Sequence, residues 1–167
     1  ATGDLFFTDL LAGKLVHANA SKAFSSSVVV EGAHYLFDVA IWARGQATNA
    51  SGEDDGGWLY ASCPTAGAIF RARLGGTVSQ IGATWQKWLD GIPEVRGLAV
   101  RGDAKRLYFV ASGTVYTAPL DDPQEYTQIA TGFRDLMRIA VDATTDADDG
   151  TSASLLVSDW NASAIYS

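Results

Sequence analysis

A short strand-like segment recurs along the chain at intervals of about 50 residues. Each copy begins with Leu and continues with aromatic, β-branched or small residues, a composition that favours β-strands. Self-similarity at a fixed spacing of this size predicts a repeat architecture in which each unit is one small supersecondary element. The four copies are Leu5-Phe6-Phe7-Thr8-Asp9, Leu59-Tyr60-Ala61-Ser62-Cys63, Leu107-Tyr108-Phe109-Val110-Ala111 and Leu155-Leu156-Val157-Ser158-Asp159.

Further strand-like segments surround each copy and complete a four-stranded antiparallel meander. An inner strand is expected at residues 38–41, 97–100 and 138–141, before the recurring segment. A third strand is expected after it, at residues 14–18, 68–72, 114–118 and 164–166, and an outer strand at residues 26–30, 77–81 and 126–130. Gly- and Asp-containing turns separate these runs, as in consecutive hairpins.

The pattern predicts an all-β fold, a β-propeller of four-stranded antiparallel blades. One twisted sheet cannot hide both of its faces, and blades fanned around an axis bury each face against a neighbour. The predicted repeats are residues 3–30, 38–82, 97–131 and 138–167, the first without its inner strand and the last without its outer strand. About four blades are therefore expected, either by themselves or as part of a six-bladed ring that further blades from the same or another chain would complete.

The first copy resembles the repeat of the YWTD family, the propellers of low-density-lipoprotein-receptor type. The resemblance rests on Leu5-Phe6-Phe7-Thr8-Asp9 with the following Gly13-Lys14-Leu15, and more loosely on the last copy with Trp160. It implies a six-bladed ring and polar contacts between blades at the Asp position. Cys63 and Ala111 replace the Asp in the middle copies. NHL-type and gluconolactonase-type propellers share much the same pattern.

Charge and glycosylation motifs indicate an extracellular setting. The net charge of −7 argues against nucleic acid as a partner, because phosphate binding needs clustered Lys and Arg. No apolar run is long enough for a membrane span. Asn19, Asn49 and Asn161 each begin an N-x-[ST] sequon, so we expect a secreted glycoprotein, although Asn and Ser are also common turn residues. The single cysteine, Cys63, is either a buried thiol or a link to another chain.

Two acidic loops are the candidate cation sites, and possible Ca²⁺ binding there competes with simple solvation. The loops carry Glu53, Asp54 and Asp55 in one case and Asp142, Asp146, Asp148 and Asp149 in the other. His17 and His34 have no partner at zinc-ligand spacing. No nucleophile, metalloprotease or nucleotide-binding motif is present, so the sequence indicates no catalytic residue and no cofactor. A gluconolactonase-like metal site would have only Asp38 and Glu94 near the inner strands.

Trp85 and Trp88 are the candidate partner-binding residues. In a helical turn the two rings would share one face and could form an aromatic hot spot, whereas the alternative is that they belong to the core. We therefore predict an extracellular, non-enzymatic propeller that acts as a protein–protein interaction or structural assembly module. The competing prediction is a gluconolactonase-like, metal-dependent hydrolase, and sugar binding by exposed tryptophans is a third possibility.

Overall fold

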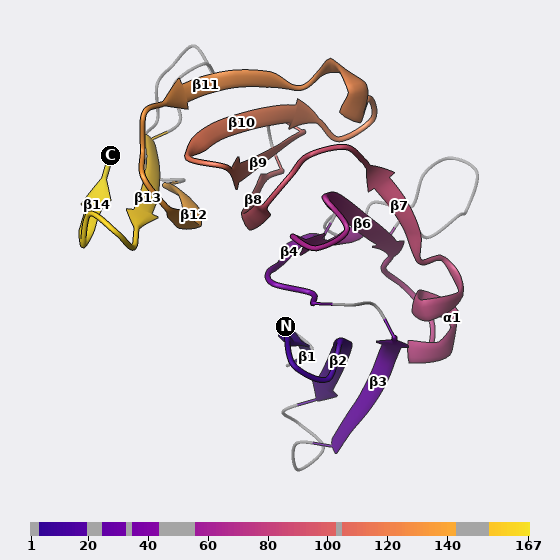
Figure 1. The fold of residues 1–167 in the computed structure, drawn as a ribbon. Helices are drawn as coiled ribbons and strands as arrows, with labels where there is room; N and C mark the ends of the chain where they lie inside the picture. Colours follow the sequence, from indigo (N-terminus) through magenta and orange to yellow (C-terminus); the bar gives the residue numbers. More distant parts are fainter. Residues whose placement is uncertain (1–3, 20–24, 33–34, 44–55, 103–104, 143–153) are drawn as a thin grey trace.

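The chain folds into four antiparallel sheets that follow one another around a common centre, as the predicted all-β propeller requires (Figure 1). The computed structural model describes residues 4–19, 25–32, 35–43, 56–102, 105–142 and 154–167. Each sheet is a meander in which every strand pairs with the next one along the chain. We call the sheets blades 1 to 4 in chain order.

The described strands give two four-stranded blades between two three-stranded ones. Blade 1 contains β1 (Asp4–Asp9), β2 (Lys14–Asn19) and β3 (Ser25–Glu31). Blade 2 contains β4 (Val39–Trp42), β5 (Trp58–Cys63), β6 (Ala68–Arg73) and β7 (Gln86–Leu89). Blade 3 contains β8 (Val95–Arg101), β9 (Arg106–Ala111), β10 (Thr114–Pro119) and β11 (Thr127–Thr131), with the 3-10 turn η2 (Pro123–Glu125) before β11. Blade 4 contains β12 (Leu136–Asp142), β13 (Ser154–Asp159) and β14 (Ala164–Tyr166).

The predicted outer strand at residues 77–81 is wrong, because this segment forms the short helix α1 (Val78–Ala83). A capping box starts the helix: the backbone N–H of Thr77 donates to Gln80 Oε1 (2.6 Å), and the backbone N–H of Gln80 donates to Thr77 Oγ1 (3.4 Å). The outer strand of blade 2 is β7 instead. Blade 2 therefore ends at residue 89, and the predicted end at residue 82 is also wrong.

Alternate residues of each recurring segment pack against different neighbours. Leu59 and Ala61 of β5 belong to the core layer between blades 1 and 2, whereas Tyr60 between them belongs to the layer between blades 2 and 3. In β9, Phe109 faces blade 2 and Tyr108 faces blade 4. Period-two alternation in a strand therefore builds three apolar layers, one for each pair of adjacent blades.

Cys63 lies in the layer between blades 1 and 2 and is 2% exposed, which confirms the prediction of a buried thiol. The same alternation leaves apolar residues exposed on the outward faces of the terminal blades. Leu5 and Phe7 of β1 are 51% and 46% exposed, and Leu156 of β13 is 44% exposed. Within the described part of the chain, none of the helices has the length and hydrophobicity to traverse a bilayer.

Candidate binding face at the ring axis

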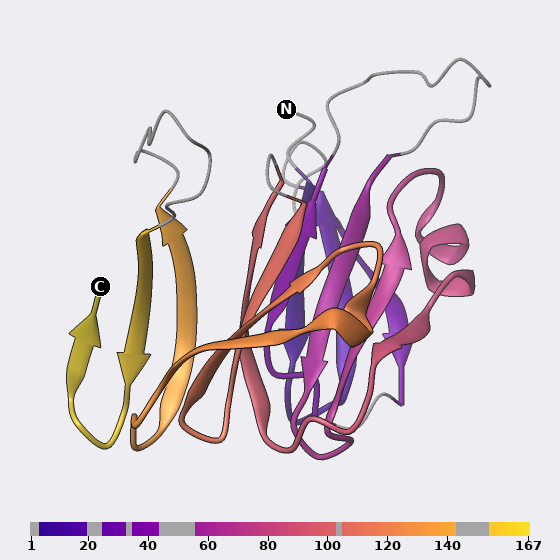
Figure 2. The same ribbon diagram turned by 90° about the horizontal axis from the view of Figure 1, so that it is seen from above.

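The β1–β2, β5–β6, β9–β10 and β13–β14 turns and the connections between blades lie together on one face of the arc. Ile92, in the β7–β8 connection, donates its backbone N–H to the Gly67 carbonyl of the β5–β6 turn (2.8 Å). Phe133, in the β11–β12 connection, donates in the same way to Gly113 of the β9–β10 turn (3.2 Å). Gly113 is required there, since its φ is +72° and a Cβ would lie 2.4 Å from the Phe133 oxygen. In Figure 2 the β13–β14 turn and the β11–β12 connection lie at the lower edge of the strands.

A cleft of about 410 Å³ opens on this face and receives side chains from all four blades. Its walls are mainly apolar or aromatic, and two of its aromatic side chains are well exposed: Trp160 (74%) in the β13–β14 turn and Tyr35 (49%) before β4. Ligand clefts in proteins commonly combine such walls with a few polar groups. The lining residues are Leu10, Tyr35, Phe37, Pro64, Thr65, Arg96, Asp135, Met137 and Trp160.

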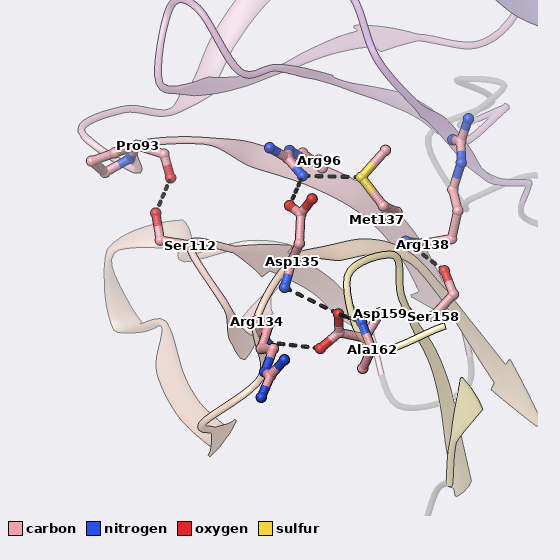
Figure 3. A network of polar contacts seen from close by, with 10 residues as sticks. All are labelled: Pro93, Arg96, Ser112, Arg134, Asp135, Met137, Arg138, Ser158, Asp159 and Ala162. Atoms are coloured by element: carbon pink, nitrogen blue, oxygen red, sulfur yellow. Dashed lines mark hydrogen bonds and ion pairs between the residues drawn. The ribbon is translucent and has the colours of Figure 1, made fainter. Parts of the chain in front are cut away.

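An ion pair between adjacent blades supplies the charged groups of the cleft. Arg96 of β8 pairs through Nη1 with the carboxylate of Asp135, and the same nitrogen lies 3.0 Å from Met137 Sδ (Figure 3). The side chains of Arg96 and Asp135 are 25% and 28% exposed, so the pair is neither fully buried nor fully solvated. A ligand can therefore reach a cation and an anion that already hold each other in place.

A second ion pair joins blades 2 and 4 across the inner strand of blade 3. Arg138 of β12 pairs with Asp38, and its guanidinium lies over the Phe37 ring, 4.9 Å from the centroid. The other oxygen of Asp38 accepts the backbone N–H of Leu98 (2.9 Å). Gly97 precedes Leu98 in β8, and a Cβ on it would be 2.7 Å from Arg138 Cα. The missing side chain of Gly97 thus lets β8 and β12 approach each other closely.

Hydroxyl groups at equivalent positions of the recurring segment donate hydrogen bonds to the backbone of the next blade on this face. Thr8 donates to the Phe37 carbonyl (3.3 Å) in blade 2, and Ser62 donates to the Arg96 carbonyl in blade 3. Ser62 Oγ also accepts the backbone N–H of Asp38 (3.1 Å). Blade 3 has Val110 at this position, which has no hydroxyl to offer. The backbone of the inner strands at the cleft is therefore held by side chains of the preceding blade.

Asp159 fixes the turn that carries Trp160. Its buried carboxylate accepts backbone N–H groups from Arg134 (2.8 Å), Ala162 (3.0 Å) and Asp135 (3.2 Å), and Figure 3 shows them converging on it. Burial alone would raise the pKa of Asp159, but these N–H donors outweigh it and hold the pKa below its ordinary value. The carboxylate therefore stays ionised near neutral pH and anchors the wall of the cleft.

The three predicted glycosylation sites fall in different places. Asn19 ends β2 and donates through Nδ2 to Asp4 Oδ1 (2.8 Å). Asn161 is exposed in the β13–β14 turn, next to Trp160, on the face that carries the cleft. Asn49 lies outside the described residues. Modification at these positions stays a prediction.

The predicted cation sites are largely outside the described part of the chain. Only Asp142, which ends β12, is described; the other acidic residues, Glu53, Asp54, Asp55, Asp146, Asp148 and Asp149, are not, and neither is His34. His17 contacts the carboxylate of Asp4 (2.8 Å). Asp38 is held by Arg138 and Leu98, and Glu94 is exposed. Among the described residues, no group of three or more His, Cys, Asp or Glu is placed to hold a metal ion.

Trp85 and Trp88 do not form the predicted helical pair. Helix α1 ends at Ala83, and Trp88 belongs to strand β7, so the two rings point to opposite faces of blade 2. Trp85 is half-buried and stacks on Phe70 at 5.2 Å between ring centroids. Trp88 is 5% exposed and donates to the Leu120 carbonyl (3.2 Å), so the core interpretation holds and a partner cannot reach this ring.

The sequence did not single out the residues that form the cleft. Arg96 and Asp135 are far apart in the sequence, as are Asp38 and Arg138, and no motif connects either pair. Trp160 was notable only as the residue that follows the last recurring segment. That position was the available signal, because Leu10, which follows the first recurring segment, lines the same cleft.

Comparison with solved structures supports the propeller class defined by these blades. Nidogen, in a complex with laminin, superimposes with a TM-score of 0.66 at 12% identity, covering 98% of this chain and 60% of that one. A catalytically inactive His-to-Ala variant of virginiamycin B lyase from Staphylococcus aureus, with quinupristin, gives 0.62 at 15% identity, covering 98% and 47%. An auxiliary nutrient binding protein from Bacteroides thetaiotaomicron gives 0.61 at 12% identity, covering 95% and 43%.

These similarities establish the fold of the chain. No family model and no curated protein matches the sequence. The chain spans about half the length of the solved propellers that it resembles. Those propellers include a component of a protein complex, a lyase and a nutrient binding protein, so the shared architecture serves several kinds of function.

Proposed function

We infer that the chain is part of a propeller that binds a protein partner at the axial cleft. The observation that carries this inference is the exposure of Trp160 (74%) beside a cleft to which all four blades contribute. Exposed aromatic side chains set in a rigid surface are typical of binding hot spots. The hydrogen bonds of Asp159 hold the Trp160 turn in place, so little ordering would be needed on binding.

The cleft favours a peptide segment with an apolar side chain and a polar or charged group beside it. Trp160, Tyr35 and Leu10 offer apolar contact, and the Arg96–Asp135 pair offers both a donor and an acceptor. The nidogen structure, solved as a complex with laminin, gives a precedent for a protein-binding propeller of this architecture. The proposal includes the extracellular setting expected from the sequons, for which the test is glycan mass on Asn19, Asn49 or Asn161 after expression in a secreting cell.

The experiment is selection of random dodecapeptides on the immobilised protein, followed by affinity measurement for the selected peptides. Trp160→Ala is expected to weaken binding about 30-fold, the size typical of a lost hot-spot aromatic. Ile129→Ala is the matched control, because Ile129 is a 46% exposed apolar residue on β11, at the outer edge of blade 3. Equal affinities for the wild type and Trp160→Ala would contradict the proposal.

An enzymatic propeller is the competing class, as the lyase among the similar structures illustrates. In the gluconolactonase-like version, a divalent metal would be held near the axis. Elemental analysis of the purified full-length protein distinguishes the two classes. A stoichiometric divalent metal that is lost together with activity on chelation would favour the hydrolase over the binding module.

A further inference from the structure

A second cleft, of about 370 Å³, lies between blades 2 and 3 and shares no lining residue with the axial cleft. It lies toward the opposite ends of the strands: Trp42 ends β4, and Trp58 begins β5. The residues that line it are Trp42, Trp58, Arg71, Lys105, Leu120 and Asp121.

Two buried polar atoms beside this cleft, the Tyr60 hydroxyl and Arg71 Nε, make no hydrogen bond of good geometry, although the Arg71 side chain lies close enough to act on the Tyr60 hydroxyl. Tyr60 of β5 is fully buried, and it is the register partner of Arg71 on β6. Unpaired polar atoms are rare in protein interiors because leaving water without a new partner is costly. Tyr60 lies behind the lining of the cleft, next to its register partner Arg71, and the charges of Arg71 and Asp121 both act on its hydroxyl.

Both unpaired atoms are hydrogen-bond donors at neutral pH. Burial raises the pKa of Tyr60 to about 12 against the opposing charge and hydrogen bonding of Arg71, so the hydroxyl keeps its proton. The Nε of a guanidinium carries a proton and cannot accept a hydrogen bond. Two neighbouring buried donors beside one cleft call for an acceptor, and an oxyanion can accept from both.

The walls of the cleft suit a flat ring attached to that anion. The Arg71 guanidinium lies over the Trp58 ring at 4.2 Å from its centroid, and Trp42 adds a second indole. Arg71 and Lys105 supply two positive charges against the single carboxylate of Asp121. This balance contrasts with a chain whose net charge is −7.

We propose that the cleft between blades 2 and 3 binds a small organic anion that carries a flat ring. Its oxyanion accepts hydrogen bonds from the Tyr60 hydroxyl and Arg71 Nε, and its ring lies against Trp58 and Trp42. The volume falls at the lower end of the range found for small-molecule sites, so the ligand is compact. Because the two clefts share no residue, this site is independent of the proposed partner-binding face.

The test uses 2-naphthoate as the probe, with 2-naphthyl phosphate as a second anion and 2-naphthalenemethanol as the neutral analogue. Isothermal titration calorimetry measures the three affinities for the purified protein. At least one anion is expected to bind at least about tenfold more tightly than the neutral analogue, and the ratio between the two anions identifies the preferred oxyanion. Failure of both anions to bind below about 1 mM would overturn the proposal.

Tyr60→Phe separates a ligand site from a packing defect. The variant is expected to lose about tenfold in affinity for the better anion, with little loss of melting temperature because the hydroxyl makes no hydrogen bond of good geometry inside the protein. Tyr108→Phe is the matched control, since Tyr108 occupies the equivalent buried position of blade 3. Arg71→Lys keeps the charge without Nε–H and is expected to weaken anion binding as well. Unchanged affinity in Tyr60→Phe, or a marked fall in its stability, would refute the assignment.

Discussion

Replacing Ser62 by Ala is expected to loosen the contact between blades 2 and 3. The Ser62 hydroxyl is fully buried, donates to the Arg96 carbonyl and accepts the backbone N–H of Asp38 (3.1 Å). Ala leaves both backbone groups without this partner at a position that water does not reach. A buried unpaired group costs about 1–3 kcal/mol, and a carbonyl tolerates the loss better than an N–H. We therefore expect the variant to lose about 2 kcal/mol of unfolding free energy, with a melting temperature about 4–8 °C lower.

Urea unfolding followed by tryptophan fluorescence measures this change, with calorimetry as the second method. Ser158→Ala is the matched control from blade 4, because Ser158 is half-buried and its hydroxyl accepts only the Arg138 N–H (3.2 Å) among the described contacts. Its loss is expected to stay below about 1 kcal/mol. If Ser62→Ala stays within about 0.5 kcal/mol of the wild type, the hydroxyl does not couple the blades and the reasoning fails.

Two more substitutions test how the inner strands and the Trp160 turn are held. Gly97→Ala places a Cβ 2.7 Å from Arg138 Cα and 2.9 Å from two further backbone atoms of β12. We therefore expect the free energy of unfolding to fall by about 1–3 kcal/mol in the same urea assay. An unchanged midpoint would show that β8 and β12 separate easily. Asp159→Asn should lower the melting temperature at neutral pH. The difference from the wild type should shrink as the pH falls below about 4, because the carboxylate with its lowered pKa stabilises the fold only while it is ionised. A difference that stays constant from pH 7 to pH 3 would contradict the role given to that carboxylate.

The repeat was readable from the sequence because strands of this fold obey local rules. Alternation and turn residues predicted the recurring segments correctly, from β1 at Asp4–Asp9 to β13 at Ser154–Asp159. The failure at residues 77–81 had a local cause as well. Thr77 and Gln80 form a capping box that starts a helix, whereas the place of this segment in the repeat had predicted a strand.

The candidate site was much less readable, because it depends on side chains brought together by the ring. Arg96 meets Asp135, and Arg138 meets Asp38, only after three inner strands are placed side by side. Trp88 shows the opposite problem. Its pairing with Trp85 in an expected helical turn suggested a surface hot spot. Its position on β7 instead buries it against Tyr60, with ring centroids 5.1 Å apart. Exposure therefore had to come from the structure.

Because successive side chains of β5 and β9 point to opposite faces, each of these strands packs against both neighbouring blades with separate sets of residues. A substitution of Leu59 alters the packing against blade 1, and a substitution of Tyr60 alters the packing against blade 3. The two apolar layers can therefore vary independently, so the residues of one layer can be substituted while those of the other stay unchanged. A propeller built in this way tolerates variation unit by unit, provided that each newly altered surface still matches the single neighbour it touches.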